Sequence, residues 1–201
     1  MADVLLTERL RLRPWLARDE APMAAINRDP EVARYLNRPT DEAAVSAFFG
    51  HVAAHWDTYG YGLYAVDLLA AEERFVGFAG FSHPTFIPAV ADRPELGWRL
   101  SRSAWGAGLA TEAATAVLHD GFHRLGLSEL IAVIHPENER SRRVATKLGM
   151  RPECQLHNPV LGREVDIWQT TPGAGRAALS PIARRPPSDE LRERRVHGHS
   201  P

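Results

Sequence analysis

Alternating apolar and polar residues predict β-strands in several parts of the chain. Residues 5–14 alternate as a half-buried strand does, with leucines on one face and arginines on the other. The apolar runs 60–69 and 74–81, separated by a polar turn, indicate a hairpin. The fully apolar run 130–135 is typical of a strand buried in a sheet. Further strands are expected at 95–101, 151–157 and 164–170.

Helical spacing of apolar residues predicts most of the remaining elements. Within 17–35, two short helices are expected to meet at Pro30, with Asp29 as the cap of the second. Longer helices are expected at 40–58, at 109–125 before Gly126, and from Asn138 to Gly149. A proline-rich loop is expected at 84–94. This order predicts an α/β fold with a mixed, mostly antiparallel sheet of about six to seven strands, flanked by helices, with one parallel crossover.

Length and composition limit the domain organisation. A chain of 201 residues that is 44% hydrophobic can bury one substantial core. We expect a single domain over residues 1–171 and a disordered Arg- and Pro-rich tail over 172–201, which lacks apolar periodicity. The single cysteine, Cys154, fits a reducing compartment, and neither a signal peptide nor a bilayer-spanning run is visible. A cytoplasmic protein without membrane contact is therefore expected.

Charge is unevenly distributed along the chain. The formal net charge is −1, but the tail from Gly173 onward holds six arginines against three acidic residues, which leaves the body acidic. An acidic body lacks the basic surface on which sequence-independent nucleic-acid binding depends. No nucleic-acid partner is expected.

A glycine turn stands out between a predicted strand and a predicted helix, in Arg99-Leu-Ser-Arg-Ser-Ala-Trp-Gly-Ala-Gly-Leu-Ala-Thr-Glu-Ala113. Such a junction binds phosphate, because the first helical turn leaves N–H groups unpaired and Gly106 and Gly108 let the backbone approach an anion. A Walker loop is excluded because the only lysine, Lys147, follows a threonine. A dinucleotide fingerprint is excluded because its third glycine position is Thr111.

Two motifs carry a family resemblance. The run from Ser103 to Ala113 is similar to the pyrophosphate-loop motif Trp-Gly-x-Gly-(aromatic or Leu)-Ala-Thr-Glu-Ala of acyl-CoA-dependent N-acyltransferases. The run from Asn138 to Met150 is similar to the same family's motif Asn-x-x-Ser-x-x-Val-x-x-Lys-Leu-Gly-(Met or Phe). The chain, apart from its tail, thus resembles the GNAT (Gcn-type N-acetyltransferase) superfamily, specifically its ribosomal-protein-alanine N-acetyltransferase (RimJ/RimL)-like branch. The superfamily often has Gln or Arg where this chain has Ser103, so backbone amides are expected to hold the phosphates more than a side-chain cation does.

The resemblance implies a GNAT fold and acetyl-CoA as the donor co-substrate, with no metal. Glu95 would act as the base that deprotonates the amine or as a rim carboxylate that binds a cationic substrate. Ser141 would donate a hydrogen bond to the departing thiolate, with a helix-opening serine as the alternative. Trp105 would pack beside the cofactor or anchor the loop. The implied cofactor-binding residues are Leu100, Arg102, Ser103, Trp105, Gly106, Ala107, Gly108, Leu109, Ala110, Thr111, Asn138 and Ser141.

The resemblance implies a protein N-terminal α-amino group as the acceptor. Two alternatives remain open: a small-molecule amine such as an antibiotic or a polyamine, and a non-catalytic acyl-CoA-binding sensor or interaction module. A homodimer also remains open.

Several aromatic and histidine residues allow a structural interpretation as well as a functional one. Four aromatic residues could line an acceptor cleft or belong to the core: Tyr35, Trp56, Phe81 and Trp98. The pairs His51/His55 and His119/His123 have the i, i+4 spacing of helical metal ligands. Asp120 replaces the glutamate that the zinc motif requires, and His119 and His123 fall away from the apolar stripe of their helix, so they are expected at the surface without a metal. His51 and His55, on another helix, are expected at the surface as well.

Overall fold

The computed structural model describes residues 4–36, 42–70, 74–173 and 183–185. The strands are β1 (Val4–Leu6), β2 (Leu10–Arg13), β3 (Leu63–Leu68), β4 (Arg74–Ser82), β5 (Glu95–Leu100), β6 (Leu130–Ile134), β7 (Arg151–Asn158), β8 (Arg163–Thr170) and β9 (Ala183–Arg185). The α-helices are α1 (Glu20–Arg28), α2 (Pro30–Ala33), α3 (Glu42–Tyr59), α4 (Leu109–His123) and α5 (Glu139–Lys147). Short 3-10 turns lie at Ala17–Asp19, Pro88–Val90 and Arg102–Ala104.

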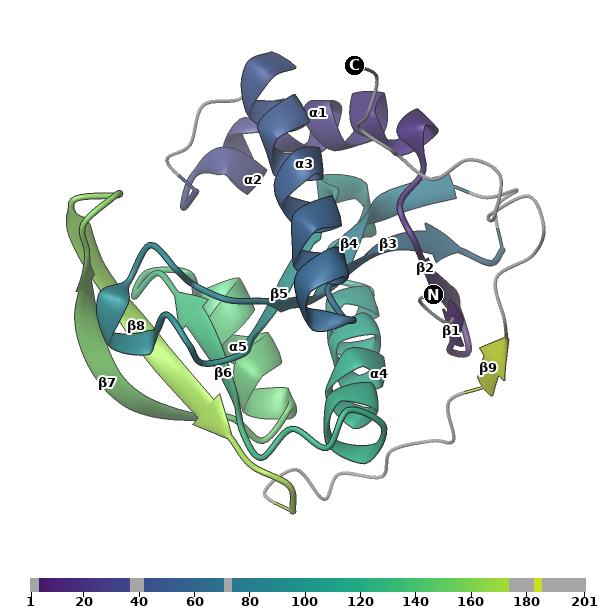
Figure 1. The fold of residues 1–201 in the computed structure, drawn as a ribbon. Coiled ribbons are helices and arrows are strands. Elements are labelled where there is room, and N and C mark those ends of the chain that lie inside the picture. Colours follow the sequence, from purple (N-terminus) through teal and green to yellow (C-terminus); the bar gives the residue numbers. More distant parts are fainter. Residues whose placement is uncertain (1–3, 37–41, 71–73, 174–182, 186–201) are drawn as a thin grey trace.

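All described strands join one sheet, in the order β7-β8-β6-β5-β4-β3-β2-β1-β9 (Figure 1). Every neighbouring pair is antiparallel except β5 and β6, which are parallel. The prediction of an α/β fold with a mostly antiparallel sheet is therefore confirmed. The predicted number of strands is too low, because eight described strands lie within residues 4–170 and β9 adds a ninth.

The first predicted strand is in fact two strands. A tight turn separates β1 from β2, closed by the Thr7 N–H donating to the Leu10 carbonyl over 3.0 Å. The chain then folds back so that Leu5 pairs with Leu12. In a straight strand Leu5 and Leu12 would lie on opposite faces, because they are seven residues apart; folding back places them on the same face and pairs Leu6 with Arg11 on the other. The prediction of one strand with Leu6, Leu10 and Leu12 on the same face is therefore wrong for Leu6, because the turn exchanges the faces and buries Leu5 instead.

The predicted tail contributes a short strand. Ala183–Arg185 forms β9, which pairs antiparallel with β1 at the edge of the sheet. The expected disorder of residues 172–201 stays a prediction beside this observation. Residues 174–182 and 186–201 lie outside the described residues, so the expected domain limit at residue 171 stays a prediction.

Helices cover both faces of the sheet (Figure 1). On one face, α4 packs against β2, β4 and β5, and α5 packs beside α4. The core on this face includes Leu96, Val117 and Leu148. On the other face, α1 and α3 bury Met23 and Phe49 against β3 and β4. No helix within the described ranges is long and apolar enough to cross a membrane.

Local sequence signals place several helix ends correctly. The Asp29 side chain caps α2 by accepting from the Glu31 N–H over 2.9 Å, and Pro30 is the first residue of α2. Asn138 caps α5 in the same way, since its Oδ1 accepts from the Ser141 N–H over 3.1 Å. The helix predicted from residue 40 begins at Glu42 in the described part of the chain, and α4 ends at His123, slightly before the predicted limit.

Arg13 does not follow the alternation that the sequence predicts for residues 5–14. It was placed on the polar face, yet its side chain is only 1% exposed. Its guanidinium donates to both carboxylate oxygens of Asp19, over 2.6 and 2.8 Å, and from Nε to Asp67 over 2.7 Å. Burial acts to lower the pKa of Arg13, but the bonds to the two carboxylates outweigh it and raise that pKa. The buried cation is thus fully paired, as a charge in a core must be.

Candidate active site

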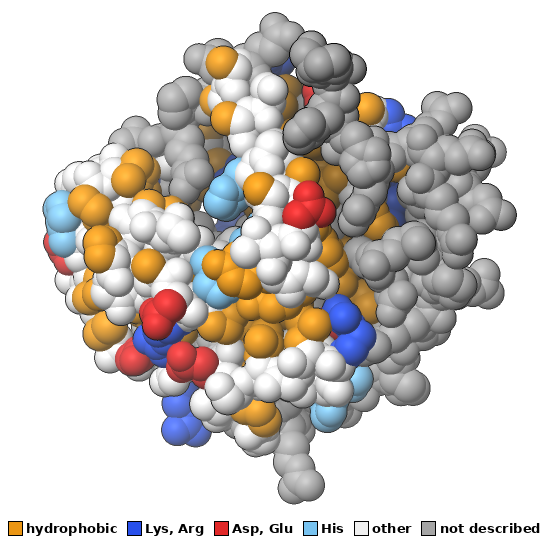
Figure 2. All heavy atoms as spheres, viewed as in Figure 1, with side chains coloured by type: hydrophobic (Ala, Val, Ile, Leu, Met, Phe, Trp, Pro, Cys, Tyr) orange, Lys and Arg blue, Asp and Glu red, His pale blue; other side chains and the backbone are white. Residues whose placement is uncertain are grey.

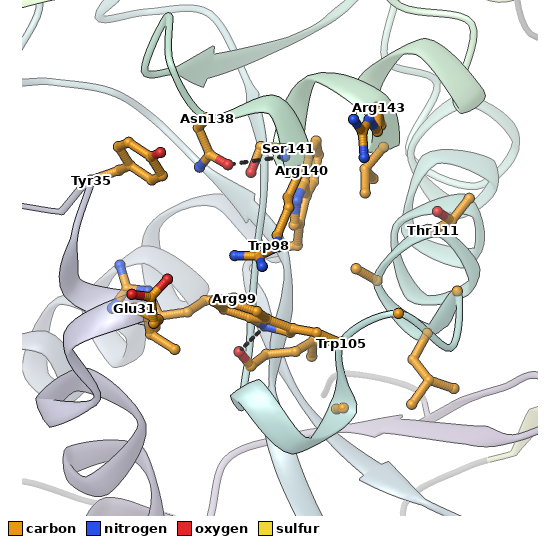
Figure 3. Close-up of a pocket in the computed structure, with 18 of the residues that line it drawn as sticks. Glu31, Tyr35, Trp98, Arg99, Trp105, Thr111, Asn138, Arg140, Ser141 and Arg143 are labelled. Atoms are coloured by element: carbon orange, nitrogen blue, oxygen red, sulfur yellow. Dashed lines mark hydrogen bonds between the residues drawn. The ribbon is translucent and has the colours of Figure 1, made fainter.

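The strands β5 and β6 diverge, and the divergence creates space for a site. The two strands pair only at Glu95 and Ile131. Beyond this pair, a cavity of about 340 Å³ lies between the end of β5 and the start of α5. Figure 3 shows side chains from both elements, from α2 and from the start of α4 around it. The cavity therefore brings together four segments that lie far apart in the sequence.

The glycine turn forms one wall of this cavity. Gly106 and Gly108 both have left-handed backbones, with φ of 78° and 79°. Gly108 is the N-cap of α4 and supplies no side-chain cap, and the first bond inside the helix runs from the Glu112 N–H to the Gly108 carbonyl. The N–H groups of the first turn therefore face outward with the positive end of the helix dipole. This is the geometry of an anion site, as the sequence predicted.

Trp105 holds the glycine turn against β5. Its indole Nε1 donates to the Leu100 carbonyl over 2.9 Å. The Arg140 guanidinium from α5 lies over the same ring, 4.4 Å from its centroid. Trp105 is thus an anchor of the loop and also lines the cavity.

Basic side chains reach the cavity from α5. Arg143 and Lys147 lie one helical turn apart, so they share a face of the helix, and both line the cavity. Arg102 does not line it and instead pairs with Asp29, with 3.5 Å between Nε and Oδ2. The expectation that backbone amides would hold the phosphates more than a side-chain cation did not include the α5 cations. Their i, i+4 spacing was visible in the sequence, but the direction of that face was not.

The predicted site residues fall into two groups. Nine of the twelve expected cofactor-binding residues line the cavity: Leu100, Trp105, Gly106, Gly108, Leu109, Ala110, Thr111, Asn138 and Ser141. Arg102, Ser103 and Ala107 do not line it. Because Asn138 is the cap of α5, Ser141 is not needed as a cap. Its proposed role toward the thiolate stays a prediction.

Glu95 is separated from this cavity. It lies at the end of β5 that is still paired with β6, and its Oε2 accepts from the Ser82 hydroxyl over 3.0 Å. The nearest β5 residue of the lining is Trp98, about 10 Å further along the strand. The acidic residue that does line the cavity is Glu31, on α2. Sequence reasoning missed Glu31 because no local motif surrounds it.

Tyr35 closes the cavity on the side of α2. Its hydroxyl donates to the Glu137 carbonyl over 3.1 Å, and its ring lies 5.0 Å from that of His135. Burial lowers the pKa of His135, and Arg163 adds to this effect. The His135 Nδ1 accordingly accepts from the Glu137 N–H over 3.1 Å. These contacts tie α2 to the loop that carries Asn138.

The structure distinguishes between the structural and the functional interpretations of the aromatic and histidine residues. Tyr35 and Trp98 line the cavity, whereas Trp56 and Phe81 pack in the core. His51 is exposed as expected, but His55 is only 7% exposed, which corrects the prediction for that residue. Within the described residues, no group of three or more metal-ligating side chains occurs.

His55 is buried because it has two partners. Its Nδ1 lies 2.8 Å from the Tyr61 carbonyl, and its Nε2 lies 3.0 Å from the Nδ1 of His83. The carbonyl can only accept, so Nδ1 of His55 carries the hydrogen and Nε2 accepts from His83. Sequence spacing could not show this, since His83 comes from a different element.

The fold and the cavity are those of an acyltransferase that uses an acyl-CoA. The family model described as "Acetyltransferase (GNAT) domain" matches residues 9–151. The chain belongs to this family, and GNAT enzymes use acetyl-CoA as the acetyl donor.

Known proteins similar to this chain agree with the family. YkkB, an uncharacterized protein of Bacillus subtilis (strain 168), is 32% identical over 73% of this chain and 84% of its own length. The uncharacterized N-acetyltransferase p20 of Bacillus licheniformis is 27% identical over 83% of this chain and 93% of its own length. The crystal structure of an acetyltransferase from Agrobacterium tumefaciens str. C58 has a TM-score of 0.74 and 27% identity, covering 85% of this chain and 95% of that one.

Proposed function

We propose that this protein transfers the acetyl group of acetyl-CoA to a primary amine by direct attack of the amine on the thioester. One observation carries the proposal: a single cavity combines the α4 glycine turn, the α5 cations, the Ser141 position and the carboxylate of Glu31. The first three suit a phosphorylated thioester, and the last suits an ammonium group.

The residues of the cavity fit the donor. The first-turn N–H groups of α4 would hold the pyrophosphate, and Gly106 leaves room for it because a Cβ there would meet no atom within 4 Å. Arg143 and Lys147 would add positive charge beside these phosphates. The backbone of Leu100, at the end of β5 that diverges from β6, would pair with the pantetheine amides as an added strand does. Acetyl-CoA supplies a thioester that an amine can attack without an acyl-enzyme intermediate.

Ser141 would assist the departing sulfur. Its side chain belongs to the cavity lining at the start of α5, where Asn138 fixes the backbone (Figure 3). A hydroxyl donor beside a developing thiolate stabilises the charge that forms there. The same position also receives the positive end of the α5 dipole.

Glu31 would meet the acceptor amine. Glu31 and Tyr35 form the wall that faces α5 across the cavity (Figure 3). An ionised carboxylate there would bind the ammonium form and draw it toward the thioester. Glu95 remains our candidate for a more distant base that would take the proton through water.

For the acceptor we propose a protein N-terminal α-amino group. Two solved structures of the same fold, a ribosomal-protein-S5-alanine acetyltransferase from Vibrio fischeri and a spermidine N-acetyltransferase from Vibrio cholerae, are 17% and 15% identical, with TM-scores of 0.66 and 0.65. At that distance, the fold alone is shared, so it does not select between a protein and a polyamine acceptor.

The deciding experiment follows CoA release from acetyl-CoA with a panel of amines: peptides with N-terminal Ala or Ser, polyamines and aminoglycosides. We expect release with the peptides above the rate without an acceptor. Mass spectrometry of a lysate incubated with labelled acetyl-CoA would show whether label enters proteins or small molecules. A protein that binds CoA but releases none with any amine, in the panel or the lysate, would be a non-catalytic acyl-CoA-binding module instead.

A further inference from the structure

The turn between β1 and β2 contacts the first turn of α4 through a concentrated set of polar bonds. The Glu112 carboxylate accepts from the Thr7 hydroxyl over 2.6 Å, from the Arg9 backbone N–H over 2.9 Å and from the Arg9 Nε over 2.7 Å. The Nη2 of Arg9 lies 2.5 Å from the same carboxylate. The Nη1 of Arg9 donates to the Ala107 carbonyl over 2.9 Å. The guanidinium is thus fixed beside the glycine turn.

Glu112 places a negative charge next to the anion site. It is four residues beyond Gly108, in the first turn of α4, where an acidic residue interacts favourably with the helix dipole. Burial acts to raise the pKa of Glu112, but the donors from Thr7 and Arg9 outweigh it and hold that pKa below its ordinary value. Glu112 is therefore ionised at neutral pH. Alone, this charge would repel a phosphate bound to the same helical turn.

Arg9 supplies the matching positive charge without belonging to the cavity. It is absent from the cavity lining, and its side chain is 45% exposed against 16% for Glu112. An ion pair whose cation is nearly half exposed contributes only modestly to folding stability. The pair lies beside the anion site, where its net charge affects the binding of a phosphate. This location points to a role in binding the donor.

We propose that Arg9 is a positioning residue for the donor: it cancels the charge of Glu112, and the N-terminus of α4 can then bind the phosphates of CoA. Arg9 acts through Glu112, and neither residue touches the donor. The inference rests on the proposed use of acetyl-CoA.

The experiment measures the dissociation constants of CoA and of pantetheine, which lacks the phosphates, by calorimetry. The variants are Arg9→Gln, Glu112→Gln and the double variant. Arg9→Gln leaves Glu112 uncompensated, and we expect it to weaken CoA binding roughly tenfold while pantetheine binding stays within about twofold. Glu112→Gln should bind CoA at least as tightly as the wild type. The double variant should return to within about threefold of the wild type.

Three outcomes would overturn the inference. If Glu112→Gln weakens CoA binding as much as Arg9→Gln, the pair is only a mechanical tether. If the double variant stays as weak as Arg9→Gln, Arg9 contacts the phosphates directly. If Arg9→Gln binds CoA like the wild type, the charge of Glu112 does not matter.

Arg9→Lys, which keeps the charge, is the second test and should stay within about threefold of the wild type. A loss of CoA binding equal to that of Arg9→Gln contradicts charge cancellation.

These results are separate from a failure of the proposed function. A wild-type protein that does not bind CoA contradicts the proposed donor. A wild-type protein that binds CoA without acetylating any amine contradicts only the proposed reaction, and the binding pattern of the Arg9 and Glu112 variants can still be measured.

Discussion

At the scale of single residues, two carboxylates compete for the acceptor amine. Glu95 follows a family motif in sequence, but it bonds to Ser82 at the paired end of β5. Glu31 belongs to no motif, but it lines the same cavity as Ser141. A charged partner must be within hydrogen-bond reach of the group that it binds. Location in the cavity therefore favours Glu31 as the residue that binds the amine.

Replacing Glu31 with Gln should weaken acceptor binding. We expect the KM for the amine to rise about tenfold or more, because a charge-assisted bond to an ammonium group is lost. The KM for acetyl-CoA should change by less than about twofold. Steady-state kinetics with each substrate varied in turn would measure both values. Glu95→Gln is the matched variant, and a larger rise in amine KM for Glu95→Gln than for Glu31→Gln would reverse the assignment.

Replacing Ser141 with Ala should slow the reaction more than it weakens binding. The loss of one hydrogen bond to a developing thiolate predicts a fall in kcat of roughly 10- to 100-fold. Thr146→Ala serves as control, since Thr146 is exposed on α5 and bonds to the Arg142 carbonyl. An unchanged kcat for Ser141→Ala would show that Ser141 does not assist the departing thiolate.

At the scale of elements, β4 and β5 approach each other closely at the end of β5. Gly77 pairs with Leu100 and has φ of 137°, a backbone that L-residues rarely adopt. A Cβ at this position would lie 2.1 Å from the Arg99 carbonyl oxygen and 2.8 Å from the Leu100 Cα. Both neighbours are backbone atoms of the strand that leads into the glycine turn. Because Gly77 has no Cβ, β5 can lie this close to β4 in the position that places Leu100 in the cavity lining.

Gly77→Ala should therefore destabilise the fold and disturb the site together. We expect the free energy of unfolding to fall by about 3 kcal/mol or more, from backbone strain combined with the clash. Gly97→Ala is the control on β5, because a Cβ there meets no atom within 4 Å, and its effect should stay below about 1 kcal/mol. Urea denaturation of both variants gives the comparison. Equal stabilities would show that β4 and β5 separate without cost.

At the scale of the whole molecule, buried histidines make stability depend on pH. His55 on α3 and His83 after β4 join two elements as a neutral pair. Burial lowers the pKa of both residues; His83 and His51 add to the effect at His55, while the bond to Tyr61 opposes it. Asp92 opposes the shift at His83. The folded protein therefore binds fewer protons than the unfolded chain when the pH falls below the ordinary histidine value of about 6.5.

The free energy of unfolding should consequently fall as the pH is lowered from 7.5 to 5.5. The contribution of each histidine is intact above about pH 6.5 and is lost below it, by at most about 1.4 kcal/mol per pH unit and per residue. Denaturant titrations across this range measure the slope. His83→Asn should flatten it, while His123→Asn, which changes an exposed residue that does not act on His55 or His83, should leave it as it is. A slope unaffected by His83→Asn would assign the pH dependence to other groups.

How far the sequence predicts this protein depends on the range of the interactions involved. The caps at Asp29 and Asn138 and the turn at Gly108 were predicted because each depends on residues within one helical turn. The turn at Thr7 was missed because residues 5–14 were taken as one straight strand, although the fold-back places Leu5, and not Leu6, on the face of Leu12. Burial of Arg13 was missed because both of its carboxylate partners lie outside its own strand.

The sequence by itself determined the class of fold and the family, and it predicted the glycine turn as an anion site, because these follow from local periodicity and from motifs of adjacent residues. Only the tertiary structure decided which side chains share the cavity. It brought Glu31 and the cations of α5 to the glycine turn, left Glu95 at the paired end of β5, and placed Arg9 against Glu112. These positions depend on how α2, α5 and the β1–β2 turn pack against residues that are distant in the chain. A local sequence pattern carries no information about such contacts.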